Sequence, residues 1–439
     1  MDVSKGRVVV ASPVSSRVAS ARGWRLAAWA RGAWGPAVVV FVGVGALLGA
    51  YLALGGDVRD FLHIGRQFLA KGGDASAVIR YDPSYHGYPA DGIGYDGQFY
   101  YFFAIDPAHA AAYMDEPAYR LSRPLYPMLA RALALGQPWL VPWVMLLINW
   151  LAIGGTALAL GDVLRRRRLS PWLTLIYVAF PGTLAALHAD VTEPLAYALV
   201  ALGLWLWERG ERRVWLWPGV AFALAILTRE TAAAFPLALA LGAAISGGLA
   251  ARGRGARIRG HEWSAYGVIE AAWRPALWLA GVMAPYLAWK GFVLVWMGSE
   301  GVPSELVPTL VPFQGLAALW PWAPSLWASA LFVGIPGALL LGLAVWGLWR
   351  RPAAPELWAL ALQSLFFCVL LRAASWYMIS AFRLSTGSLL ALLWAAPLLV
   401  GLAKRSRLWM ALIFALWVCL APVALAGFFP SLAGALGAR

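Results

Sequence analysis

Long apolar runs separated by short polar segments fill most of this chain of 439 residues. The first run covers residues 36–54 and is long enough to cross a bilayer, which needs about 20 apolar residues. This pattern predicts an all-α, polytopic integral membrane protein with about eleven transmembrane helices. The other ten are expected at residues 138–160, 171–187, 194–207, 214–228, 231–249, 275–297, 326–349, 355–371, 384–403 and 408–428.

The same pattern divides the chain into five regions. The polar stretch after the first apolar run is long and holds most of the polar chemistry. A cleaved signal peptide is the alternative for the N-terminus, but the basic region is long for one and no clean cleavage site follows. The regions are a basic N-terminus at 1–35, a first transmembrane helix at 36–54, an outer catalytic loop with short helices at 55–137, a helix bundle at 138–428 and a tail at 429–439.

Composition agrees with a membrane protein, because 61% of the residues are hydrophobic and only 13% are charged. A soluble domain of that composition would leave large apolar surfaces in water. The net charge of +14 does not indicate nucleic-acid binding, because the basic clusters fall in alternate loops, on the same side as the N-terminus. By the positive-inside rule that side is cytoplasmic. Cys368 and Cys419 lie inside apolar runs and indicate no disulfide or metal framework.

Ionisable side chains gather in the loops that this topology turns outward. Charged groups beside apolar spans are costly and tend to be functional. We expect them to converge at the outer face as a polar, partly desolvated site. The candidates are Asp57, Asp96, Arg120 and Arg123 in the first outer loop, His188, Asp190 and Glu193 in the second, Arg229 and Glu230 in the third, and Arg372 and Arg383 in the fifth.

Some of these candidates also have a purely structural interpretation. Asp190 and Thr192 could cap the helix that begins beside them, since Thr or Asp before a proline is a normal helix start. Arg229 and Glu230 could form a local ion pair at the membrane interface.

The same holds for two arginines and for Asp96. Arg372 and Arg383 could be anchors whose aliphatic stems lie along a span while their charged ends reach water. Asp96 could shape a turn before Gly97, since aspartate suits such turns. In that outer position Asp96 would contribute little to stability, and an Asp96→Asn chain is expected to fold and insert normally.

Four short motifs carry a resemblance to a known family. They are YDGQFYY at residues 95–101, RPLYP at 123–127, TEP at 192–194 and LTRET at 227–231. Together they resemble GT-C type membrane glycosyltransferases, most closely the bacterial proteins thought to build cell-surface glycopolymers. The likeness to the GPI mannosyltransferases is more distant, because Tyr95 stands where those enzymes have tryptophan. Sugar and acceptor therefore cannot be carried over.

The resemblance implies that a sugar moves from a polyprenyl-phosphate carrier to a glycan, lipid or protein acceptor on the outer face of a bacterial inner membrane. Asp96 is then the candidate catalytic base, and Asp57 could orient the acceptor or bind a metal. Whether a divalent metal takes part is left open by the acids present. The candidate substrate-binding residues are Arg120, Arg123, Tyr126, His188, Asp190, Glu193, Arg229, Glu230, Arg372 and Arg383.

Two other functions remain possible at this stage. A flippase for lipid-linked sugars would carry its ionisable residues near the bilayer midplane, whereas here they cluster at one face. An outer-face glycan polymerase or ligase would be expected to carry its large loop late in the chain, whereas here it comes early.

Overall fold

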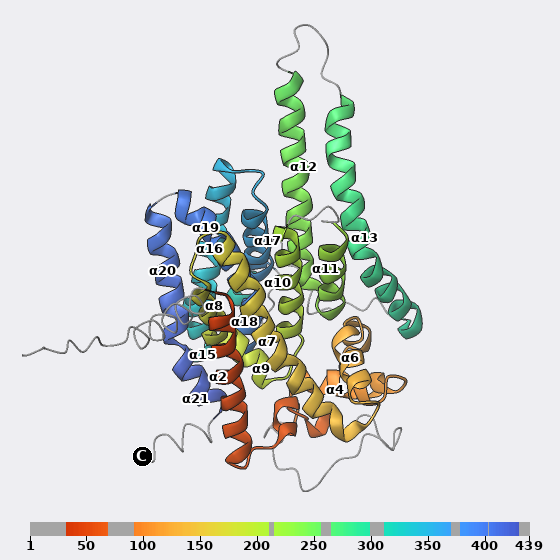
Figure 1. The fold of residues 1–439 in the computed structure, drawn as a ribbon. Helices are drawn as coiled ribbons and strands as arrows, with labels where there is room; N and C mark the ends of the chain where they lie inside the picture. Colours follow the sequence, from red (N-terminus) through yellow and green to blue (C-terminus); the bar gives the residue numbers. More distant parts are fainter. Residues whose placement is uncertain are drawn as a thin grey trace, which may run out of the picture.

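The computed structural model describes residues 32–68, 92–209, 215–255, 265–298, 311–369, 378–402 and 404–429, and all statements below concern these ranges. This part of the chain is helical, with one isolated β-bridge between Ile64 and Gly94 and no strand. The long helices form one bundle (Figure 1). They are α2 (Trp34–Ala53), α7 (Val141–Arg166), α10 (Glu193–Arg209), α11 (Leu216–Thr228), α12 (Ala234–Gly255), α13 (Ala265–Met297), α16 (Ile335–Arg350), α17 (Pro355–Val369), α19 (Thr386–Leu402) and α20 (Lys404–Cys419).

Shorter helices connect these. They are α4 (Gly97–Ile105), α5 (Pro117–Arg120), α6 (Leu125–Leu133), α8 (Thr174–Ala179), α9 (Pro181–His188), α14 (Gln314–Ala317), α15 (Pro324–Ser329), α18 (Met378–Leu384) and α21 (Ala421–Phe428). Single turns include η1 (Val58–Leu62), η2 (Ala110–Tyr113) and η5 (Glu230–Ala233).

Seven helical segments in the described ranges are long and apolar enough to cross a membrane, so the chain is built as a membrane protein. An eighth is reached if α8 and α9, which meet at an angle of 58°, count as one broken span. The predicted count of eleven is not confirmed. The remaining predicted spans correspond to α10, α11 and α17, which have 17, 13 and 15 residues.

Burial separates a central helix from those that face lipid. The span Ile379–Leu402, which contains α19, is 72% buried over its most apolar window, whereas Trp273–Met297 in α13 is only 11% buried. Trp394 of α19 is fully buried, with its ring 6.4 Å from that of Phe235 in α12, and α19 itself contacts α7, α16 and α17. The exposed leucines, valines and tryptophans of the outer helices would be costly in water but are favourable against acyl chains.

The segment between α2 and α7 folds against one end of the bundle, where α4 and α6 lie together (Figure 1). It has its own apolar core, which includes Phe102, Tyr113 and Leu121. Arg131 of α6 donates hydrogen bonds of 2.9 and 2.8 Å to the carbonyls of Ala104 and Ile105, the last turn of α4. A cation suits the carbonyl end of a helix, so this contact fixes α4 against α6.

The two ends of the bundle carry separate sets of charges. Glu193 begins α10 and faces the end where α4 lies, while Glu208, near the other end of α10, pairs with Arg167 after α7. Arg167 also pairs with Glu356 at the start of α17. Glu193, from a loop predicted to face outward, and Arg167, from a loop predicted to face the cytoplasm, therefore lie at opposite ends of α10.

Candidate functional site

Asp96 lies immediately before α4, and its position is fixed by the glycine that follows it. A Cβ atom on Gly97 would come within 2.4 Å of the carbonyl oxygen of Ala189 and 3.1 Å of that of Leu62. Only glycine allows α4 to begin against these two segments. Asp96 does occupy the turn before Gly97, as the alternative interpretation expected, but its side chain makes no cap hydrogen bond to the helix and is free to contact other parts of the chain.

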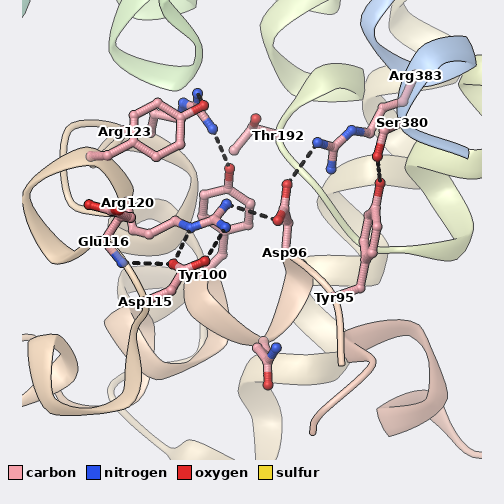
Figure 2. A network of polar contacts seen from close by, with 12 residues as sticks. Tyr95, Asp96, Tyr100, Asp115, Glu116, Arg120, Arg123, Thr192, Ser380 and Arg383 are labelled. Atoms are coloured by element: carbon pink, nitrogen blue, oxygen red, sulfur yellow. Dashed lines mark hydrogen bonds and ion pairs between the residues drawn. The ribbon is translucent and has the colours of Figure 1, made fainter. Parts of the chain in front are cut away.

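Two arginines from distant parts of the chain meet at the Asp96 carboxylate (Figure 2). Arg120 Nη1 donates to Asp96 Oδ1 at 2.8 Å, and Arg383 Nη2 lies 2.7 Å from Oδ2. The Asp96 side chain is only 16% exposed. Burial alone would raise the pKa of this carboxyl, but Arg120 and Arg383 outweigh burial and hold the pKa well below its usual range. Asp96 is therefore an ionised, weakly basic carboxylate in this arrangement.

Arg120 is held rigidly by Asp115 and an aromatic ring. Its Nε and Nη2 atoms donate to the two Asp115 oxygens, each at 2.9 Å (Figure 2). Its guanidinium also lies over the Phe99 ring, 4.4 Å from the centroid. A planar guanidinium held by paired donors and by stacking presents its remaining N–H group in a fixed direction.

Arg383 joins Asp96 to a second acid. It comes from the end of α18, and its Nε atom lies 2.8 Å from Glu193 Oε1. Its guanidinium is 5.1 Å from the centroid of the Tyr95 ring. Within the described ranges its buried Nη1 atom has no hydrogen-bond partner, which leaves a donor free for another anion. The interpretation of Arg383 as an interfacial anchor is wrong, because its side chain is buried and faces inward.

Arg229 and Glu230 point to different partners. Arg229 Nη1 lies 3.1 Å from Glu193 Oε1, while Glu230 accepts two hydrogen bonds from Arg123, at 2.8 Å from Nε and 2.6 Å from Nη2. The interpretation of these neighbours as one local pair is therefore wrong. Arg123, only 1% exposed, also donates to the hydroxyl of Tyr100 at 3.2 Å and to that of Tyr119.

Four carboxylates and four guanidiniums lie in one group, called the Asp96 cluster below, in which the Arg123–Glu230 pair is joined to Arg120 through the Tyr119 ring that both arginines contact. Its formal charges cancel, which explains how so many ionised groups are tolerated beside apolar helices. Six of its members were predicted site residues apart from Asp96 itself. The cluster consists of Asp96, Asp115, Glu193, Glu230, Arg120, Arg123, Arg229 and Arg383.

Asp190 and Tyr126 form a separate buried group with Asn149 of α7. The Tyr126 hydroxyl and Asn149 Nδ2 both donate to Asp190 Oδ1, each at 2.7 Å. Burial raises the pKa of the Asp190 carboxyl to about 7, although these two hydrogen bonds oppose the rise. The group fastens the loop after α9 to α6 and α7.

Two other predicted site residues, His188 and Asp57, lie outside the Asp96 cluster. His188 Nδ1 is 3.1 Å from His63 Nε2, and the His188 ring stacks on Phe428. Asp57 caps η1 and pairs with Arg59 at 2.6 Å. Arg372 lies outside the described residues. The structure thus gives Asp57 a structural role at the helix start and does not bring its carboxylate into the Asp96 cluster.

Sequence reasoning missed several residues that support this site. Asp115 looks like any exposed acid, and its only signal is its place five residues before Arg120. Asn149 could have been found, because an amide inside an apolar span needs partners. Tyr119 and Ser380, which bonds the Tyr95 hydroxyl at 2.9 Å, carry no clear signal (Figure 2).

No group of three or more histidine, cysteine, aspartate or glutamate side chains in the described ranges is arranged to hold a metal ion. In the cluster, Asp96, Glu193 and Glu230 each pair with an arginine.

No protein-family model matches the sequence, and no curated protein matches it.

Proposed function

We propose that the protein is a membrane glycosyltransferase of the GT-C type that takes its sugar from a polyprenyl-phosphate carrier. The observation that supports this most is the meeting of Arg120 and Arg383 at Asp96, where the buried Arg383 Nη1 has no hydrogen-bond partner among the described residues. Such a transfer needs a carboxylate to receive a proton and guanidiniums to receive a phosphate, and both lie within one group here.

The reaction follows from the chemistry of these groups. An acceptor hydroxyl attacks the anomeric carbon while the bond from that carbon to the phosphate oxygen breaks. The electron pair of that bond stays on the leaving phosphate, which the guanidiniums stabilise through paired hydrogen bonds. The hydroxyl proton passes to Asp96, which acts as general base.

Arg120 and Arg383 have a second effect on this reaction. While both pair with Asp96 they keep its pKa low, so the free protein holds a poor base. A donor phosphate should bind Arg383 more strongly than Asp96 does. The phosphate oxygens can accept a hydrogen bond from Nη1 of Arg383, which has no partner among the described residues. As Arg383 turns to the phosphate, Asp96 becomes more basic. Donor binding therefore prepares the base.

The orientation belongs to the same proposal. The basic ends of the helices support the proposal that the Asp96 cluster faces away from the cytoplasm, and the proposed membrane is the inner membrane of a bacterium. Nucleotide sugars are cytoplasmic, so an outward site requires a lipid-linked donor. The acceptor is a glycan, lipid or protein of the cell surface.

Deleting the gene and analysing both surface glycans and lipid-linked sugars tests the proposal. We expect a surface glycan to lose one sugar, or to end early, while the sugar-loaded carrier stays exposed on the outer leaflet. Accumulation of the loaded carrier on the inner leaflet would instead identify a flippase. Complete repeat units left unjoined on the carrier would identify a polymerase or ligase.

A further inference from the structure

A groove runs along the bilayer-facing side of α7, between α2 and α10, with a volume of about 760 Å³. Its walls are apolar and include Trp34, Leu151 and Leu202, which are 62%, 49% and 38% exposed. Gly155 lies on its floor, and a Cβ atom placed there would have no atom within 4 Å. The groove is therefore open where a larger residue on α7 would have filled it.

One end of the groove carries charge. The charged end of the groove lies beside the C-terminus of α10, whereas Glu193 and the Asp96 cluster lie at the N-terminus of that helix. It is lined by Asp162, Arg165, Arg166 and Arg209. Asp162 pairs with both neighbouring arginines, at 2.8 Å from Arg166 Nε, and accepts from the Trp205 indole at 3.0 Å. Three guanidiniums against one carboxylate leave an excess of two positive charges.

The length of the groove suits a lipid chain. Its lining on α7 extends from Ile148 to Arg166. At about 1.5 Å per residue these helix positions span about 27 Å, against a hydrocarbon core of about 30 Å. An acyl chain of one leaflet therefore fits wholly inside the groove when its headgroup lies at the arginine end.

We propose that this groove is a specific site for an anionic phospholipid, whose phosphate binds Arg165, Arg166 and Arg209 and whose acyl chain lies along α7. Guanidiniums bind phosphate through paired hydrogen-bond donors. A zwitterionic headgroup also carries a cation, which the arginines at this end of the groove would repel. The open floor at Gly155 and the apolar walls accept the chain. This site is separate from the Asp96 cluster and does not depend on the proposed glycosyl transfer.

Native mass spectrometry of the purified full chain tests the proposal. The protein in mild detergent is given dioleoyl phosphatidylglycerol or dioleoyl phosphatidylcholine, and the lipid-bound fraction is measured. We expect wild type to bind phosphatidylglycerol preferentially. The Arg165→Gln/Arg166→Gln chain should bind it about tenfold more weakly, as expected for the loss of charge-assisted hydrogen bonds. Both arginine side chains are substantially exposed, at 48% and 37%, so their replacement should leave the fold intact.

Two further variants separate the site from general charge and from bulk lipid. Gly155→Leu fills the groove and keeps every arginine, so it should also weaken phosphatidylglycerol binding. Arg350→Gln/Arg351→Gln removes a matched pair of consecutive arginines at the end of α16 and should leave binding unchanged. Equal binding of the two lipids, or equal loss with the α16 variant, would overturn the proposal. A dimer that Gly155→Leu dissociates would show that a second copy occupies the groove, which would also overturn it.

Discussion

The guanidinium of Arg383 lies 2.7 Å from Asp96 and thereby ties the segment after α2 to the end of α18. The same side chain reaches Glu193 at the start of α10. Three parts of the chain that are far apart in sequence are thus held together by one residue. The local geometry of the proposed site therefore depends on the packing of the whole bundle.

Replacing Arg383 by Lys should destabilise the protein and impair transfer. A lysine ammonium cannot face Asp96 and Glu193 with separate donors, so one buried acid loses its partner. We expect a cost of about 2 kcal/mol, roughly half of the ~3–5 kcal/mol for removing a buried partner outright. Thermal unfolding in detergent measures it, with Arg350→Lys as the control because Arg350 is exposed and lies over Trp346. Equal melting temperatures for the two variants would contradict the bridging role of Arg383.

The Arg123–Glu230 pair should behave as a coupled unit. Arg123→Gln leaves the Glu230 carboxylate without its two donors, so we expect a loss on the order of 3 kcal/mol. Glu230→Gln should cost less, because the Glu230 side chain is 31% exposed and Arg123 keeps its contacts with Tyr100 and Tyr119. The double variant should recover part of the loss in a double-mutant cycle. Strictly additive losses would show that the pair is not coupled.

Asp190 should make stability fall as pH rises. Burial raises its folded-state pKa from 3.8 to about 7, so the folded chain holds the proton more tightly than the unfolded chain between these values. The free energy of unfolding therefore decreases across that interval and levels off above pH 7. Asp190→Asn removes this contribution while keeping the size of the side chain. Melting temperatures measured from pH 4.5 to 8 should decline more steeply in wild type than in the variant, and parallel curves would contradict the assignment.

The orientation of the two charged ends can be tested by cysteine labelling. In a chain without Cys368 and Cys419, Ala108→Cys should react with an impermeant thiol reagent in intact cells. Ser170→Cys, at the end bearing Arg165 and Arg166, should react only after the cells are opened. Both positions are exposed, so access rather than burial decides the result. The reverse labelling pattern would place the Asp96 cluster in the cytoplasm and remove the argument for a lipid-linked donor.

The convergence of the outer loops could be predicted from sequence, because alternating basic loops assign each connection to one side. That rule placed Asp96, Glu193 and Arg383 at the same face, where the structure finds them. It could not show that Arg229 turns to Glu193 while Glu230 turns to Arg123. That choice depends on the backbone direction between α11 and η5, which no hydropathy pattern records.

The number of spans was harder to predict for a similar reason. Residues 171–187 read as one apolar run, but Pro181 pushes Phe180 out of the helical region and separates α8 from α9. Apolar content also does not distinguish a full span from the 13 residues of α11. Composition predicts which helices avoid water. The position at which a helix breaks, and its length, depend instead on single residues such as Pro181.

Asp96 was treated from sequence as a surface residue that Asn could replace without loss of stability. The structure changes that expectation, because Asn would leave Arg120 and Arg383 facing a neutral side chain in a largely buried position. Asp96→Glu keeps the charge but moves the carboxylate by one methylene. Asp96→Glu should therefore keep more of the stability than Asp96→Asn while still misplacing the base, and thermal unfolding of the two variants separates loss of folding from loss of the base.

Complementation of a gene deletion with these variants, read out by mass spectrometry of surface glycans at matched protein levels, is the decisive measurement of whether Asp96 is the catalytic base. Asp106→Asn is the control, because Asp106 lies in the same segment but pairs with His109, outside the Asp96 cluster. A positioned general base typically contributes ~10²–10⁴-fold in rate. We therefore predict that wild type and Asp106→Asn restore the glycan, while Asp96→Asn and Asp96→Glu do not. Full restoration by Asp96→Asn would contradict the assignment of Asp96 as the base.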